Sequence, residues 1–384
     1  MTLLLDVLFW VALILVLHSY VVYPLSLVLF SLFRKRYSFV DRNNGVLRKI
    51  SILVSAFNED KTIRERVEGF LSIDYPLFEV IVGVDGATDR TTEILSGIKD
   101  SRLKVITFEK NRGKVWVLND LQKIAGGSVL MFTDANTRLH PETLKKIERH
   151  FNDKQVGGVC GRQEILPRVE PGGQKLESEY WAYEGWLKKL EGDQGMTLGG
   201  NGAVYAIRRD LFVPFSTHAR IADDFVLPLK VIEQGYYFVY EPEALAIEQS
   251  GDLRGEFKRK VRIGAAVFAT LGSLKSMLNP LRGFAAYSLW SHKIIRWAVP
   301  LLLLILLVSN SLLASHGSFF YFTLLVQVVC YIIAAIGFIG MSFGKHIPVA
   351  SHLAYFVAAN AALLVGYTNS ILKSPETRWE VSRS

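Results

Sequence analysis

The sequence predicts an α/β protein, in which a soluble domain built on a mostly parallel β-sheet is joined to α-helical transmembrane segments. Between residue 49 and about residue 280, short apolar runs rich in β-branched residues alternate with helical stretches. Long apolar segments lie outside this region, one before it and the others after it. Half of the 384 residues are hydrophobic and only 21% are charged, which is too apolar for an ordinary soluble enzyme.

Charge and cysteine content exclude several classes of protein. The net charge is +8, but the basic residues are scattered and form no zinc-finger, RRM or basic-zipper pattern, so we expect no nucleic-acid partner. Basic residues on the cytoplasmic flanks of membrane segments explain the excess more simply. The two cysteines are Cys160 and Cys330, and the second lies in an apolar segment. A disulfide framework and a cysteine-based zinc site are therefore not expected.

The N-terminal apolar run predicts a transmembrane helix within residues 1–36. Residues 3–33 are almost continuously apolar, which is longer than the core of a signal peptide. No basic residue precedes the run and no small-residue cleavage site follows it. Three basic residues, 34–36, come directly after it and place the next domain in the cytoplasm by the positive-inside rule. We therefore expect a multi-pass protein of the inner or plasma membrane with a cytoplasmic catalytic domain.

Residues 297–372 contain apolar runs for about three further transmembrane helices. These runs cover 297–313, 318–341 and 348–372. Residues 275–296 mix Leu, Met, Phe and Trp with Lys and Arg, which predicts an interfacial amphipathic helix. Three later crossings would place the tail, residues 373–384, outside the cell. Its arginines weakly favour the inside, so incomplete crossing by one segment stays an alternative.

The middle region, residues 47–270, reads as one strand–helix domain. The predicted strands are residues 50–57, 78–84, 103–107 and 128–133. The predicted helices are residues 61–72, a helix from 88 or 89, 113–125, a helix opened by Pro141, and 174–191. In such sheets, ligands bind beyond the carboxyl ends of the strands.

Acidic and amide side chains stand at several of these strand ends. They are Asn58, Glu59, Asp85, Asp89 and Asp134. Each alone is more simply a turn former or a helix cap, but their recurrence at successive strand ends indicates one site. No G-x-G-x-x-G and no P-loop occurs, which argues against a dinucleotide dehydrogenase and an NTPase. An acidic crevice that binds phosphates needs a cation, and Mg²⁺ or Mn²⁺ suits carboxylate and phosphate oxygens.

Together with the membrane layout, these motifs resemble the membrane-bound family 2 glycosyltransferases. The resemblance covers residues 47–270 and is to the cellulose synthase-like and poly-N-acetylglucosamine synthase-like branch. It implies the Rossmann-like GT-A fold and an inverting transfer of a sugar from a nucleotide-sugar, expected to be UDP-linked. Membrane attachment suggests that the acceptor is a lipid-linked glycan or a growing cell-surface polysaccharide.

On the donor side, the resemblance assigns roles to three short motifs. Residues 55–59 (Ser-Ala-Phe-Asn-Glu) would lie against the nucleotide, with Asn58 and Glu59 as binding residues. Residues 85–89 (Asp-Gly-Ala-Thr-Asp) would supply Asp85 as acceptor for the uracil N3–H, with Asp89 nearby. Lys114 would lie near the phosphates, although an exposed lysine at the start of a helix is an equal alternative without the family context.

The Asp134-Ala135-Asn136 motif resembles the metal-binding Asp-x-Asp of the family. Asp134 matches the first carboxylate. Asn136 replaces the second, which keeps an oxygen ligand but loses its charge. The resemblance therefore implies a divalent cation, Mg²⁺ or Mn²⁺, held by Asp134 and Asn136, and leaves the preferred metal open.

On the acceptor side, the resemblance implies a general base. Residues 223 and 224 match a Glu-Asp motif, with Asp224 as the base and Asp223 in the place of the usual Glu. The alternative is that the pair merely caps a helix. Residues 199–208 resemble a glycine-rich acceptor segment, although on their own they favour a plain hairpin.

Residues 259–263 resemble the (Gln/Arg)-x-x-Arg-Trp motif of processive synthases. Arg259 and Arg262 share a helix face and could contact the diphosphate, or could form a basic interfacial helix near anionic lipid. Ile263 replaces the tryptophan of the acceptor platform, which argues against long-chain processivity. Tyr180, Trp181 and Trp186 could stack on the acceptor instead, or could belong to the core.

Two rival functions remain open. One is a processive polysaccharide synthase that tolerates Ile263, and the other is a catalytically inactive nucleotide-binding membrane scaffold. The joint presence of Asp85, Asp134 and Asp224 argues against the scaffold. Export or synthase subunits are further partners that the resemblance allows.

Overall fold

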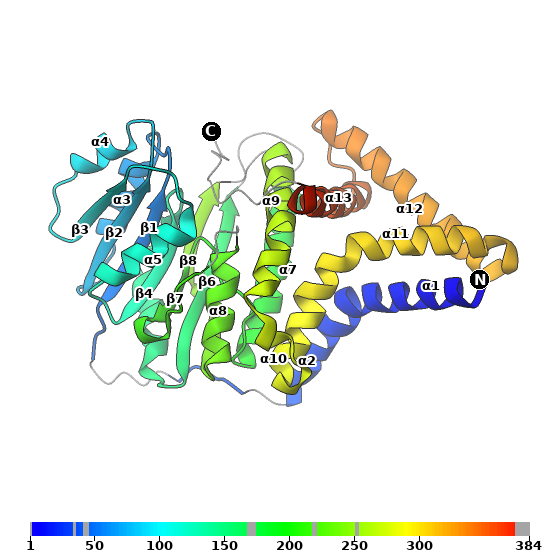
Figure 1. Cartoon of the computed structure of the whole chain (residues 1–384), viewed down its shortest axis with the longest axis horizontal. Helices are drawn as coiled ribbons and strands as arrows, with labels where there is room; N and C mark the ends of the chain where they lie inside the picture. The colour runs from blue at the N-terminus through cyan, green and yellow to red at the C-terminus, as the bar shows by residue number, and fades with distance from the viewer. Residues whose placement is uncertain are drawn as a thin grey trace.

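A computed structural model describes residues 2–33, 36–40, 46–166, 174–216, 221–249 and 253–372. A sheet domain forms one side of the molecule, and long apolar helices project from the other (Figure 1). The predicted tail, residues 373–384, and the basic residues 34 and 35 lie outside the described residues.

The described residues form an eight-stranded sheet in the order β3-β2-β1-β4-β7-β6-β8-β5. Strands β3, β2, β1 and β4 are parallel, and β6 is parallel to β8. Strand β7 is antiparallel to both β4 and β6, and β5 is antiparallel to β8. The strands are β1 (Ile50–Ala56), β2 (Phe78–Asp85), β3 (Leu103–Phe108), β4 (Val129–Asp134), β5 (Arg138–Leu139), β6 (Val156–Leu166), β7 (Tyr205–Arg208) and β8 (Tyr237–Gln249). The prediction of a mostly parallel sheet is confirmed.

Helices cover both faces of the sheet, which explains why its central strands are apolar on both sides. One hydrophobic core joins Ile50, Ile52 and Val54 of β1 to α3, α4 and α6, while Leu53 faces a second core with α5 and α8. The helices of this domain are α3 (Ile63–Leu71), α4 (Thr91–Ser96), α5 (Lys114–Ile124), α6 (Thr143–Glu148), α7 (Gln174–Asp193), α8 (Asp223–Glu233) and α9 (Leu253–Gly272).

Several predicted helix starts differ slightly from the structure, including α3, which begins at Ile63 rather than at residue 61. Helix α4 begins at Thr91 rather than at residue 88 or 89, because the Asp89 side chain stays outside the helix and accepts a hydrogen bond from the Thr91 N–H. Helix α6 begins at Thr143, two residues after Pro141. The predicted helix 174–191 is confirmed as α7.

In the part of the chain that the structure describes, four stretches of helix are long and apolar enough to cross a membrane. They are Thr2–Phe33, Phe284–His316, Ser318–Ser342 and Ala350–Leu372. The first comprises α1 (Thr2–Leu17), a π-helical turn (His18–Val22) and α2 (Tyr23–Phe33). The second comprises α10 (Phe284–Ser288), a π-helical turn (Leu289–Ile294), α11 (Ile295–Leu313) and a 3₁₀ turn. The last two are α12 (Ser318–Ser342) and α13 (Ala350–Leu372), and we name the helices of all four stretches the apolar helices.

The prediction of a single amphipathic helix at residues 275–296 differs from the structure. Residues Lys275–Leu278 and Pro280–Arg282 form two separate 3₁₀ turns. Pro280 and the left-handed Gly283 (φ 62°) interrupt any longer helix here. From Phe284 onward the chain is already part of the second apolar stretch.

The sheet domain contacts the apolar helices at several places, among them two seams between helices. Helix α9 packs closely along α13, where Gly264 and Gly366 bring the two backbones together. Helix α7 contacts α2 at the other seam. The second seam also contains a buried polar network, which is described below.

Candidate active site

The loops after β1 and β2 are locked to one another by predicted site residues. Asn58 accepts a hydrogen bond from the Thr88 N–H (2.8 Å) and lies in the left-handed region with φ 54°. Asp89 accepts from the Asp60 N–H (3.0 Å), and the Glu59 N–H donates to Thr91 Oγ1 (2.8 Å). The structure therefore brings Asn58, Glu59 and Asp89 together at the carboxyl edge of the sheet, as the sequence predicts. Burial opposes ionisation of Asp89, but hydrogen bonds from Thr91 and Asp60 outweigh it and lower its pKa.

Asp85 ends β2 with its carboxylate fully buried. One oxygen accepts from the Arg112 N–H (3.0 Å) and the other from the Gly113 N–H (2.7 Å). Burial raises the pKa of Asp85, and these two hydrogen bonds offset part of that effect. In this structure Asp85 shapes the loop that leads to Lys114. Its predicted hydrogen bond with the uracil ring of the nucleotide stays a prediction.

Lys114, at the first position of α5, lies between two carboxylates from distant parts of the chain. Its Nζ is 2.9 Å from Asp134 Oδ1 and 3.2 Å from Asp223 Oδ1. Burial alone lowers the pKa of Lys114, but the carboxylates of Asp134 and Asp223 outweigh it and raise the value. The lysine is therefore held as a cation beside the end of β4, and the alternative of an exposed helix lysine does not apply.

Gly202 lies between Asp134 and Asp224. A Cβ at position 202 would stand 3.0 Å from Asp134 Oδ2 and 3.7 Å from Asp224 Oδ2. The glycine thus lets two carboxylates flank one main-chain segment. The surrounding segment is a tight turn closed by the bridge between Asn201 and Val204, so the glycine-rich stretch is both a hairpin-like turn and part of this cluster.

The two aspartates at the start of α8 have different surroundings. Asp223 is buried, and its Oδ2 accepts from the Tyr205 hydroxyl (2.9 Å). Asp224 is only half-buried, so it is the more accessible of the two. Burial and the neighbouring Asp223 carboxylate raise the pKa of Asp224 to about 6, although Lys114 opposes the shift. A carboxylate with a pKa near 6 is suited to accept a proton near neutral pH.

The oxygen ligands around Asp134 suit a divalent cation whose coordination shell a phosphate group would complete. The Asp134 side chain is 35% exposed, so one carboxylate stays open to the solvent side. Within the described residues no group of three His, Cys, Asp or Glu side chains is arranged to hold a metal. Mg²⁺ is commonly bound by one or two carboxylates together with substrate phosphates, and these residues fit that arrangement. Asn136 follows on the same turn, and its main-chain carbonyl accepts from Arg66 Nε (3.1 Å).

Arg259 and Arg262 lie on α9, as the motif predicts, but Arg259 is engaged locally. Its guanidinium donates to both oxygens of Glu256 (2.6 and 2.7 Å) and lies over the Trp181 ring. Tyr180 is covered in a similar way by Lys260, while Trp186 is 43% exposed. Arg262 is exposed on the same helix. The Arg259 side chain thus contacts residues of α9 and α7 rather than Asp134.

Several residues that surround the site were not singled out from the sequence. Tyr205 holds Asp223, and Lys188 and Glu191 of α7 hold the main chain around Gly200. A signal was present in α7, because Glu184, Lys188 and Glu191 are spaced i, i+4 and i+7 and so share one helix face. Three charges on one face are usually solvated, however, and only their burial reveals their role.

Comparisons with known proteins agree with this architecture. Residues 51–212 match the family described as "Glycosyl transferase family 2". Poly-beta-1,6-N-acetyl-D-glucosamine synthase of Staphylococcus aureus (strain COL) is 27% identical over 227 residues, which are 58% of this chain and 55% of that protein. The enzyme of the same name from a Staphylococcus epidermidis strain is 28% identical over 218 residues, 56% of this chain and 53% of its own. The chain thus aligns with about half the length of these curated relatives.

A solved structure has the same fold across nearly the whole chain. It is a mannosyltransferase from Pyrobaculum calidifontis in complex with GDP-Man and Mn²⁺, with a TM-score of 0.70 and 18% identity. The alignment covers 96% of this chain and 99% of that one. The fold is therefore a GT-A domain with appended apolar helices, as the sequence predicted. Residues 51–212 of this chain are therefore a domain of glycosyl transferase family 2.

Proposed function

We propose that this chain is an inverting glycosyltransferase that moves a sugar from a nucleotide-sugar to a glycan acceptor at a membrane. The observation that carries the proposal is the cluster at the carboxyl edge of the sheet. There Asp134 and Asp224 flank Gly202, and Lys114 bridges Asp134 and Asp223. One accessible base, one open carboxylate and one fixed cation are what a direct displacement on a sugar diphosphate requires.

In this proposal Asp224 removes the proton from the acceptor hydroxyl as that oxygen attacks the anomeric carbon. Its pKa of about 6 keeps it ionised at neutral pH and still basic. One displacement by an external nucleophile inverts the anomeric centre and needs no nucleophile from the enzyme. Asp223 holds Lys114 and Tyr205, so it orients the site rather than reacting.

Asp134, with Asn136 on the same turn, is the proposed holder of a divalent cation. Such a cation, Mg²⁺ or Mn²⁺, would neutralise the charge that develops on the leaving diphosphate. Lys114 supplies a second positive charge beside Asp134. Asn58, Glu59, Asp85 and Asp89 shape the loops against which the nucleotide is proposed to lie.

The donor is proposed to be UDP-linked, and N-acetylglucosamine is the first sugar to test because the relatives are named for it. The acceptor is proposed to be a lipid-linked glycan or a growing cell-surface polysaccharide at the cytoplasmic face. Processive synthesis is the second candidate, which the names of these relatives favour. Product length distinguishes the two.

The test is nucleotide release by the purified full-length protein in detergent with native lipids. UDP-, GDP- and dTDP-sugars are offered with Mn²⁺, Mg²⁺ or EDTA, beside the Asp224→Asn variant. We expect release from one donor only, its loss in EDTA, and its loss in Asp224→Asn with donor binding retained. Retained transfer by Asp224→Asn would contradict the assignment of Asp224 as the base. The absence of nucleotide release with every donor and lipid would favour the inactive scaffold.

A further inference from the structure

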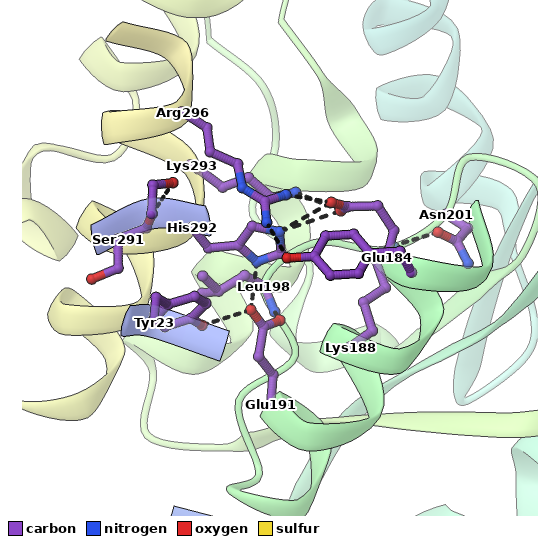
Figure 2. A network of polar contacts seen from close by, with 12 residues as sticks. Tyr23, Glu184, Lys188, Glu191, Leu198, Asn201, Ser291, His292, Lys293 and Arg296 are labelled. Atoms are coloured by element: carbon purple, nitrogen blue, oxygen red, sulfur yellow. Dashed lines mark hydrogen bonds and ion pairs between the residues drawn. The ribbon is translucent and has the colours of Figure 1, made fainter. Parts of the chain in front are cut away.

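Helix α7 carries three buried charged residues on one face. Glu184, Lys188 and Glu191 are 4%, 5% and 0% exposed and follow one another at helical spacing. Figure 2 shows them between the apolar helices and the turn that contains Asn201. Buried charges cost free energy unless each is paired, so the partners of this stripe define what it holds together.

On one side the two glutamates bind the apolar helices. Glu191 Oε1 accepts from the Tyr23 hydroxyl (2.8 Å) and lies 2.5 Å from His292 Nδ1. The other ring nitrogen of His292 faces Glu184 (3.3 Å), and Arg296 Nη1 donates to the same glutamate (2.5 Å). Tyr23 and His292 are both fully buried, so solvent water does not compete for these hydrogen bonds.

On the other side the same stripe holds the turn beside the catalytic base. Glu191 Oε2 accepts from the Leu198 N–H (2.9 Å). Lys188 Nζ donates to the Gly200 carbonyl (2.9 Å) and to Asn201 Oδ1. The Gly200 N–H in turn donates to the main-chain carbonyl of Asp224 (2.5 Å). One carboxylate thus connects two apolar helices with the turn that passes between Asp134 and Asp224.

We propose that Glu191 is a positioning residue of the transferase, which uses Tyr23 and His292 of the apolar helices to hold the 198–202 turn against Asp224. The inference rests on the proposed function. Its consequence is that the apolar helices are part of the catalytic apparatus as well as an anchor. Small displacements of a reacting group cost large factors in rate, so loosening this turn affects turnover more than donor binding.

Glu191→Gln and Tyr23→Phe test the proposal in the full-length protein. In Glu191→Gln the side chain keeps its shape, but an NH₂ group replaces one of the two oxygens. That group cannot accept a hydrogen bond, so the variant loses either the bond from the Leu198 N–H or the bonds from Tyr23 and His292. Tyr23→Phe removes a single hydroxyl and leaves Glu191 ionised with two partners, so it serves if Glu191→Gln fails to fold.

Glu79 provides a matched control. It is a buried carboxylate that accepts from a hydroxyl (Ser51, 2.7 Å) and a main-chain N–H (Gly126, 2.6 Å), and it has a cationic partner in Lys104. It lies six residues before Asp85 on β2, about 20 Å from the carboxyl edge of the sheet at about 3.3 Å per residue. Glu79→Gln therefore removes the same kind of group without touching the turn.

Two readouts are measured on folded protein. Hydrogen–deuterium exchange follows the peptide that spans residues 196–204, and nucleotide release from UDP-N-acetylglucosamine with Mn²⁺, or from the donor found active above, gives kcat and KM. We expect Glu191→Gln to accelerate exchange in this peptide and to lower kcat at least tenfold, with donor KM within twofold. We expect Tyr23→Phe to change the exchange rate and kcat in the same directions, but by less. We expect Glu79→Gln to lower the unfolding temperature without changing the exchange rate of this peptide or kcat.

Unchanged exchange at residues 198–201 in Glu191→Gln would overturn the proposal. So would an equal fall of kcat in Glu79→Gln, because that would reflect general destabilisation. If the wild-type protein releases no nucleotide from any donor, the proposed function fails, and the exchange measurement still decides whether Glu191 holds the turn.

Discussion

The Nζ atom of Lys114 lies 2.9 Å from Oδ1 of Asp134, although the two residues come from different elements and were assigned to different ligands. In this structure the lysine balances the carboxylate that we propose as the metal ligand. The same ammonium group also contacts Asp223, so it links the donor-side and acceptor-side aspartates. Each side of the site therefore depends on this one cation.

Removal of the Lys114 charge is expected to reduce transfer strongly. In Lys114→Gln the site keeps Asp134, Asp223 and Asp224 but loses the cation between them, so a negatively charged donor is repelled. We expect kcat/KM for the donor to fall on the order of 100-fold, as when a positioned electrostatic group is removed. Steady-state nucleotide release checks this. Lys123→Gln, on the same helix and paired with Asp120 at the surface, is the control and should transfer normally.

The pH dependence of transfer is expected to report Asp224. Its pKa is raised to about 6, and only the deprotonated form accepts a proton, so the rate should fall about tenfold per unit below pH 6 and level off above it. The Asp223 carboxylate contributes to the raised value, so Asp223→Asn should move this limb to lower pH. A pH–rate profile of kcat checks both statements, and a limb that stays in place in Asp223→Asn would contradict the second.

A methyl group at Gly202 is expected to disturb the site more than the fold. In Gly202→Ala the Cβ would stand 3.0 Å from Asp134 Oδ2, so the carboxylate must move. We expect kcat to fall about 10- to 100-fold, as when reacting groups are displaced, with a small change in unfolding temperature. The control is Gly69→Ala in α3, where a Cβ meets no atom within 4 Å and better helix propensity should stabilise the protein by up to about 1 kcal/mol. Activity of Gly202→Ala at the wild-type level would argue against a reacting site here.

The seam between α9 and α13 is expected to tolerate no larger residue. A Cβ at Gly366 would stand 2.4 Å from the Val261 carbonyl, and one at Gly264 would stand 2.7 Å from the Leu363 carbonyl. Gly366→Val must push the two backbones apart, and overpacking of this kind costs about 1–3 kcal/mol. Thermal unfolding in detergent, followed by tryptophan fluorescence, measures the loss. Gly272→Ala on α9, where a Cβ meets no atom within 4 Å, should leave the unfolding temperature unchanged or slightly raised.

The sequence alone determined the features that depend on local patterns. Apolar runs and helical periods follow from neighbouring residues, so the strands from β1 to β4 and three of the four apolar stretches could be placed within a few residues, while the stretch Phe284–His316 begins 13 residues before the predicted run 297–313. The acidic residues at strand ends could be grouped because parallel strands bring their carboxyl ends to one edge. The predicted helix over 275–296 is wrong because Pro280 and Gly283 divide the segment, and its mixed composition alone does not show where a helix ends.

Only the tertiary structure decided how these residues are paired. Lys114 could not be matched with Asp134 and Asp223, nor Glu191 with Tyr23 and His292, because those partners are 20 to 168 residues apart. From sequence alone, a charged residue is expected to be exposed to solvent. Whether it is buried depends on which other element packs over it. Here one face of α7 is covered by the sheet domain and the apolar helices, so Glu184, Lys188 and Glu191 on that face must find their counter-charges inside the protein. A buried charge in surroundings of low dielectric constant is costly unless it is paired. The partners of these residues are therefore determined by the packing of the helices and not by the local sequence.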